Sequence, residues 1–175
     1  MHRVIELAAA IAAAAQSLFP AAPPAVASSD AYARASGNAK PIAVRIGRAL
    51  FRTQWPAQVL NVYADAFGRF RVAGLRLSGV HFHHALNRLQ FEAEISELVA
   101  RAFAAAPVDE VDVWASVPLR VGKDLVVSGD LARPTSRTVF TVSVRRNESA
   151  DALRSRLRQG TGVFWDQDWT RSALK

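Results

Sequence analysis

The stretch 86–107 has the hydrophobic pattern of an amphipathic helix. Its start carries the signals of a helix N-terminus, because Asn87 is a good N-cap and Gln90, three residues later, completes a capping box. Pro107 ends the stretch, since proline cannot continue a helix. We therefore predict a helix over about 87–106. Its apolar residues recur at spacings of three and four and share one face: Phe91, Ile95, Leu98, Val99, Ala102, Phe103 and Ala106.

Alternating apolar and polar residues predict a β-hairpin before this helix. Residues 58–66 and 70–78 form its two predicted strands, and the glycine-containing stretch 67–69 supplies the turn. In the second strand the apolar positions shift by one residue, so we predict a β-bulge at Ala73 and Gly74. The apolar face of the first strand is expected to consist of Leu60, Val62, Ala64 and Ala66.

Further strands are predicted after the helix. Residues 111–117 and 138–145 alternate clearly, and the segment 119–128 between them has a turn composition that suits a small hairpin. Earlier in the chain, Pro41 is predicted to open a helix, because proline is tolerated in the first turn. A strand is the competing interpretation there, since residues 42–46 also alternate.

The last part of the chain is predicted to hold a helix, a short strand and a helical turn. Ser149 can cap a helix that Gly160 ends. The tail 162–174 suits a short strand followed by a turn of helix capped by Asp166 or Asp168. The order of elements favours an α+β fold. We expect a two-layer sandwich with a mostly antiparallel sheet of four or five strands and the long central helix packed on one face.

Residues 1–27 have the pattern of a secretory signal peptide. A weakly basic start precedes an alanine-rich apolar run over 7–19, prolines follow, and an Ala-x-Ala site ends at Ala27. We therefore expect a secreted or periplasmic protein that is cleaved after Ala27, with a flexible lead-in over 28–40 and a single domain over 41–175. An alanine-rich amphipathic helix or a disordered leader is the alternative. The chain has no cysteine, which excludes disulfides and thiolate chemistry.

Positive charge is concentrated in the first half of the predicted domain. The net charge is +7, and residues 34–88 hold nine basic residues against the single acid Asp65. Acids dominate 91–130, and only the fold can bring them beside these arginines. Arg69 and Arg71 alternate with phenylalanines, as in nucleic-acid binders. A basic face attracts polyanions, and in an exported protein an anionic surface polymer is favoured over nucleic acid. A soluble basic surface without a specific partner is the alternative.

His81 and His83 are the strongest candidates for a metal site. At a strand end, residues two apart project to one face, and imidazole nitrogens bind transition metals. Glu92 or Glu94 on the following helix would be the third ligand. The alternative is structural, because histidines at such a junction often hydrogen-bond to backbone groups. Without a metal, Glu94 is expected with Glu97 on the solvated face of the helix.

The remaining acidic residues indicate less. Asp166 and Asp168 form an Asp-x-Asp pair, which can hold a divalent cation, although helix capping explains them as well. The sequence contains no nucleophile-elbow, zinc-protease, phosphate-loop or dinucleotide-binding motif. We therefore expect no cofactor.

Together these patterns favour a small exported binding or assembly domain without catalytic activity. Trp114 is its predicted partner-binding residue, because strand alternation places it opposite Val113, unless a helix covers that face. A metal-dependent enzyme built on His81 and His83 is one alternative. The other is a polyanion-binding module, and in either binding case the partner is an unknown protein or an anionic surface polymer. The arginine-rich face of that module would consist of Arg45, Arg48, Arg69 and Arg71.

Overall fold

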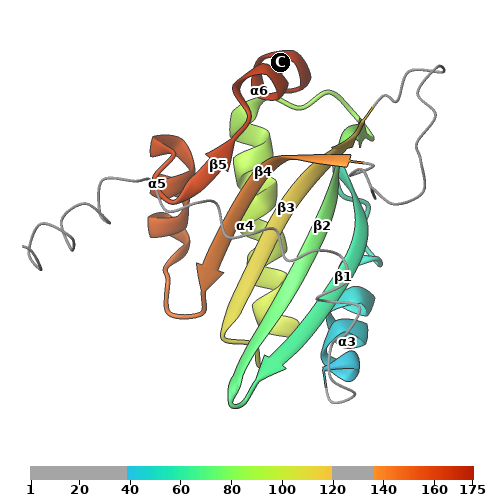
Figure 1. Cartoon of the computed structure of the whole chain (residues 1–175), viewed down its shortest axis with the longest axis vertical. Helices are drawn as coiled ribbons and strands as arrows, with labels where there is room; N and C mark the ends of the chain where they lie inside the picture. Colours follow the sequence, from blue (N-terminus) through green and yellow to red (C-terminus); the bar gives the residue numbers. More distant parts are fainter. Residues whose placement is uncertain (1–38, 120–135) are drawn as a thin grey trace, which may run out of the picture.

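The computed structural model describes residues 39–119 and 136–175. The predicted signal peptide, most of the predicted lead-in and the predicted hairpin beyond Leu119 lie outside these residues. The described chain folds into a five-stranded sheet with four helices (Figure 1). In chain order the elements are α3 (Lys40–Leu50), β1 (Ala57–Phe67), β2 (Phe70–Phe82), α4 (Arg88–Ala105), β3 (Glu110–Pro118), β4 (Ser136–Arg145), α5 (Ala150–Gln159), β5 (Val163–Trp165) and α6 (Gln167–Ala173).

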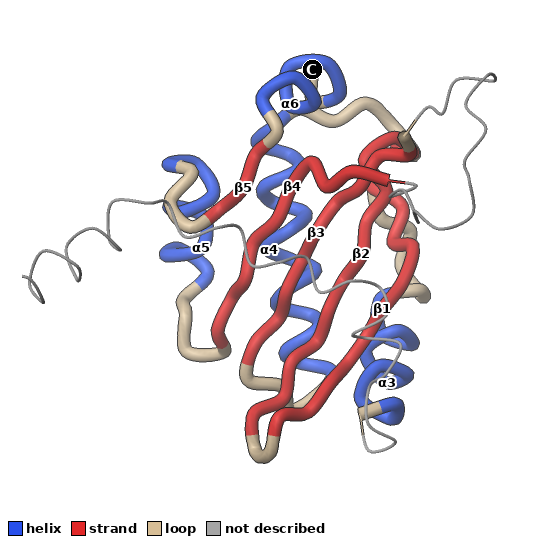
Figure 2. Tube along the Cα trace, viewed as in Figure 1, coloured by secondary structure: helices blue, strands red, loops and turns tan. Residues whose placement is uncertain are grey.

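The strands lie in the order β1-β2-β3-β4-β5. β2 and β3 are parallel, and every other neighbouring pair is antiparallel. Helix α4 connects the two parallel strands and packs across one face of the sheet, while α3 and α5 lie beside its two edges (Figure 2). This is the predicted α+β two-layer sandwich. None of the described helices is both long enough and apolar enough to cross a membrane.

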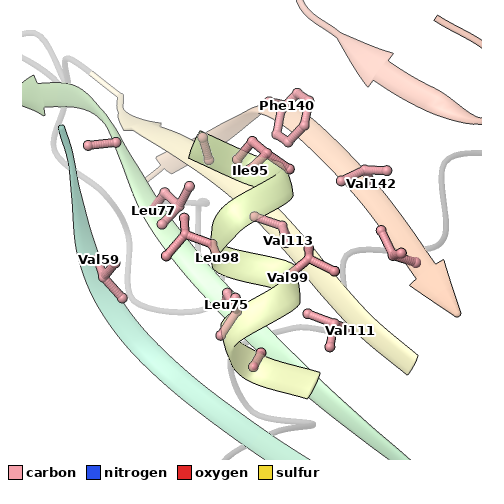
Figure 3. Packing of buried hydrophobic residues seen from close by; sticks show 14 of the residues in the cluster. Val59, Leu75, Leu77, Ile95, Leu98, Val99, Val111, Val113, Phe140 and Val142 are labelled. Carbon is pink, nitrogen blue, oxygen red and sulfur yellow. The ribbon is translucent and has the colours of Figure 1, made fainter. Parts of the chain in front are cut away.

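Helix α4 forms where its local signals placed it. The Asn87 side chain accepts the Gln90 backbone N–H, and the Gln90 side chain accepts the Asn87 N–H, each at 2.9 Å, so the capping box is complete. The apolar face of α4 is buried against side chains that project from β1 to β4 (Figure 3). The buried residues on this face include Phe91, Ile95, Leu98, Val99 and Ala102.

The other helix ends also follow the predicted signals. Pro41 lies in the first turn of α3. Ser149 caps α5 by accepting the Ala152 N–H at 3.2 Å, and Gly160 ends that helix in the left-handed conformation with φ of 73°. Asp166 caps α6. Each of these ends is therefore encoded by residues next to it in the sequence.

The predicted β-bulge in β2 is wrong. Ala73 and Gly74 pair with β1 in regular register, and the irregular pairing lies within residues 57–61, near the start of β1. The apolar residues of β2 belong to two faces of the sheet. Leu75 packs toward α4, and Val72, three residues earlier, is buried on the opposite face. The change of phase in the sequence therefore needs no extra residue.

Arg88 fastens the start of α4 to the C-terminal elements. Its guanidinium pairs with Glu92 at 2.9 Å and lies 4.8 Å above the Trp165 ring. It also donates to the carbonyl oxygens of Leu157 and Arg158, at 3.1 and 3.2 Å. These carbonyls belong to the last turn of α5 and have no partner within that helix, so one side chain joins three elements.

Arg146 performs the same task at the other end of α4. Its Nε donates to the Val108 carbonyl, and one terminal nitrogen donates to the Ala106 carbonyl, both at 2.6 Å. The same nitrogen donates to Phe103 at 3.1 Å, and the guanidinium lies 5.0 Å from that ring. The carbonyls at the end of the helix are thus bound by a residue just beyond β4.

Substitution of two glycines by alanine tests how tightly their surroundings are packed. A Cβ on Gly79 in β2 would lie 2.8 Å from Val117 Cγ1 and 3.0 Å from Val139 Cγ2, whereas a Cβ on Gly47 in α3 would meet only the Phe51 ring, at 3.6 Å. We expect Gly79→Ala to lower the free energy of unfolding by about 1–3 kcal/mol through overpacking. Gly47→Ala should raise it by about 1 kcal/mol, because alanine is the better helix former. Urea denaturation of both variants measures this, and shifts of the same sign would contradict it.

Candidate functional site

Ion pairing divides the basic residues of the chain into two groups. All seven ion pairs among the described residues involve an arginine at position 88 or later. Seven of the later arginines therefore meet acids in space. No ion pair within the described residues includes the basic residues of the segment 40–76, which are Lys40, Arg45, Arg48, Arg52, Arg69, Arg71 and Arg76.

Three of these arginines gather where the start of α3 meets the turn between β1 and β2. Figure 1 shows that the turn and the first residues of α3 lie at the same end of the molecule. Arg45 and Arg71 line one depression there, of about 480 Å³, together with Gly68 and Pro107. Arg69 is exposed in the turn itself. We call Arg45, Arg69 and Arg71 the basic end.

Two acids lie close to the basic end, and both are bound to backbone groups. The carboxylate of Asp109 accepts the Arg71 backbone N–H at 2.7 Å. The carboxylate of Asp65 accepts the Ala66 backbone N–H at 2.8 Å. Neither pairs with a guanidinium, so Arg45 and Arg69 keep their donor groups available to a ligand, and Arg71 directs only Nη1 to the Pro107 carbonyl oxygen, at 3.5 Å.

Exposed aromatic rings accompany these arginines. Phe67 and Phe70 face each other across the turn, and their exposed fractions are 64% and 41%. Gly68 takes up the positive φ, 62°, that such a tight turn requires. The predicted interleaving of aromatic and basic residues therefore becomes a surface that projects from the end of the sheet.

Trp114 lies on the face opposite α4, as alternation predicted. None of the described helices packs on that face (Figure 2). The indole ring is nevertheless only 7% exposed and stacks on Tyr63, with ring centroids 5.8 Å apart and an interplanar angle of 15°. Gly74 of β2 pairs with Tyr63 and contributes no side chain between the two rings. A partner-binding role for Trp114 stays a prediction.

His81 and His83 are both exposed at the end of β2. Among residues 39–119 and 136–175 no three or more His, Asp or Glu side chains are grouped so that they could hold a metal ion. The suggested third ligands bind elsewhere, Glu92 to Arg88 and Glu94 to the Ala57 backbone. The two-histidine metal site therefore stays a prediction without a third ligand.

The expectation that Glu94 is solvated is wrong. Glu94 is only 5% exposed, and both of its carboxylate oxygens accept the Ala57 backbone N–H, at 2.9 and 3.3 Å. Burial raises the pKa of Glu94 to about 7, against the lowering effects of the Ala57 N–H and of nearby His84. The signal was available in the sequence, because Glu94 lies three residues after Phe91, at the border of the apolar stripe.

Asp166 and Asp168 do not converge on a common site. Asp166 caps α6 and pairs with Arg137, and the Trp169 backbone N–H holds the pKa of this carboxyl below its ordinary value. Asp168 pairs with Arg171 at 2.6 Å. Helix capping and local pairing account for both side chains.

Sequence reasoning missed a second polar depression, on the sheet face opposite α4. It has a volume of about 330 Å³, and its lining includes Arg76, Ser116 and His81. Arg76 Nε donates to Ser116 Oγ at 3.2 Å. No local motif announces this grouping, because parallel pairing of β2 with β3 brings the two strands together.

Comparison of the chain with protein-family models, with curated proteins and with solved structures finds no match. The function is therefore inferred from the residues of the chain and their arrangement.

The buried carboxyl of Glu94 should make stability depend on pH. Below about pH 4.5, the ordinary pKa, Glu94 is protonated in both the folded and the unfolded chain. As pH rises toward 7 the unfolded chain ionises while the folded chain keeps its proton, so this group's contribution to stability falls by up to about 3 kcal/mol. Glu94→Gln keeps an acceptor for the Ala57 N–H and cannot ionise. We expect it to remove this fall and to stabilise the protein at pH 8.

Urea denaturation at several pH values between 4 and 8 measures the effect. Glu97→Gln is the matched control, because Glu97 is an exposed neighbour on the same helix that pairs with Arg101. It should leave most of the pH dependence in place, because the Glu97 charge raises the Glu94 pKa less than burial does. If Glu94→Gln lost stability with rising pH as steeply as the natural sequence does, the titration of another group would be responsible.

Proposed function

We propose that this chain is an exported binding domain that engages a negatively charged partner through its basic end and catalyses no reaction. The observation that carries the proposal is the unpaired state of Arg45, Arg69 and Arg71. All seven ion pairs within the described residues lie elsewhere in the domain, and this end presents guanidinium groups without carboxylate partners. An arginine cluster of this kind attracts polyanions and supplies several hydrogen-bond donors to each of them.

The support for binding also lies in how the arginines are held. Arg45 comes from α3, which packs against β1, and Arg71 comes from β2, which pairs with β1, so the spacing of their backbones is set before a ligand arrives. Arg71 Nη1 lies 3.5 Å from the Pro107 carbonyl oxygen, which directs the side chain along the end of α4. Preorganised donors lose little side-chain entropy when they bind, and this favours affinity.

Export rests on the sequence of residues 1–27. A signal peptide cut after Ala27 would place the domain outside the cytoplasm, where anionic polymers and lipid headgroups are the polyanions it meets. We expect Edman degradation or mass spectrometry of the protein recovered from the producing cells to find Ser28 as the first residue. Recovery of a chain that still begins at Met1 from the cytoplasm would refute export and restore nucleic acid as a candidate partner.

Heparin provides a general polyanion with which to test the basic end. We expect the natural chain to be retained on heparin, with an affinity that falls steeply as salt rises, because binding releases condensed counterions. The variant Arg45→Gln with Arg71→Gln should elute at lower salt. The slope of log affinity against log salt should become shallower by about two, one for each lost contact.

The matched control is Arg154→Gln with Arg171→Gln, which removes the same charge from two exposed arginines on α5 and α6. It should elute close to the natural chain if the basic end is the binding surface. Equal losses in the two double variants would mean that net charge alone governs retention, and the proposal would then fail.

A further inference from the structure

We infer that the partner of the basic end is an anionic phospholipid bilayer, into whose headgroup region the turn between β1 and β2 inserts Phe67 and Phe70. This inference rests on the proposed function, because it uses the same three arginines. It adds a reason for the two aromatic side chains, which the binding of a soluble polyanion leaves unexplained.

The turn between β1 and β2 exposes two large aromatic side chains, which the binding of a charged soluble ligand does not require. Phe67 and Phe70 are paired residues at the tip of the hairpin, and both rings are exposed, although large aromatic side chains usually lie inside a protein or at an interface. Only Gly68 and Arg69 separate them. The turn that carries both residues lies at the extreme end of β1 and β2 (Figure 1). Such a projection suits entry into an apolar layer.

The arginines lie where headgroup phosphates would be. Arg69 is in the turn between the two rings, Arg71 is one residue beyond Phe70, and Arg45 approaches from α3 beside the same depression. Aromatic residues at the acyl boundary with arginines at headgroup level are the arrangement of proteins that lie on a membrane surface. Each such cation raises partitioning to an anionic surface by about fivefold. A polymer in solution supplies the charge without the apolar layer.

Helix α3 continues this surface along the same side of the sheet. Val44, Arg48 and Phe51 recur at spacings of four and three residues, which places them on one stripe of the helix. They line one depression, and both apolar side chains are more than half exposed. Arg45 lies next to this stripe, so α3 presents apolar and basic groups together beside the turn between β1 and β2.

Vesicles distinguish the bilayer from a soluble polyanion. The full chain is sedimented with vesicles of phosphatidylcholine alone and with vesicles containing phosphatidylglycerol. We expect binding to the anionic vesicles to exceed binding to the neutral ones by at least tenfold and to fall with salt. The variant Phe67→Ser with Phe70→Ser should lose at least tenfold in affinity for the anionic vesicles. Its retention on heparin should not change, and a cooperative urea denaturation transition shows that it folds.

The matched control replaces exposed apolar residues elsewhere, as Leu89→Ser with Phe164→Ser on α4 and β5. It should bind anionic vesicles as the natural chain does. Every variant carries the same residues 1–27, so any contribution of that segment to vesicle binding cancels between them.

Two results would overturn the inference. The first is a Phe67→Ser, Phe70→Ser variant that binds anionic vesicles as tightly as the natural chain. The second is a natural chain that is retained on heparin and does not sediment with anionic vesicles. Either result leaves the proposed polyanion function standing without insertion of the two rings into a bilayer. If the natural chain were not retained on heparin, the proposed function itself would be refuted.

Discussion

Burial of the apolar face of α4 against the sheet is the interaction on which the rest of the structure depends. The helix connects β2 to β3, so its packing is what allows these two central strands to run parallel. Phe91, Ile95 and Leu98 are fully buried there. Figure 3 shows Ile95 and Leu98 beside strand residues such as Leu75 and Val113. The outer elements depend on this layer in turn, because α3 and α5 contact α4 and pack beside the edges of the sheet that it covers.

Arginine side chains stabilise the packed layers further, through hydrogen bonds to backbone carbonyl groups and ion pairs with acidic residues. Arg88 and Arg146 bind the carbonyl groups at two helix ends and tie α4 to the C-terminal part of the chain. The remaining arginines after Arg88 mostly pair with nearby carboxylates. The acidic residues in these ion pairs therefore neutralise arginines at position 88 or later. The segment 40–76 keeps its positive charge because almost no acid lies within it.

The ion-paired and the unpaired arginines lie in parts of the domain that contribute differently to its structure. The side with α4, α5 and α6 holds the structure together through buried rings, caps and ion pairs. The end with α3 and the β1–β2 turn contributes little to that network and presents arginine and phenylalanine side chains to the solvent. Glu94 marks the border between the two parts, since it fixes the first residue of β1 to α4 at the cost of a buried carboxyl. The exposed side chains of this end lie outside the hydrophobic core, to which α3 contributes Ile46 and Leu50.

The sequence by itself determined the local elements, because helix caps, prolines, glycines and alternation act between residues close in the chain. Asn87 begins one helix and Gly160 ends another where the sequence predicted, and the α+β sandwich follows from the order of elements. Tertiary structure alone decided that apolar residues of β2 are buried on both faces of the sheet, that Glu94 is buried, and that every arginine forming an ion pair within the described residues lies at position 88 or later. Each of these depends on which distant segments pack side by side, and the pattern within one element does not contain that information.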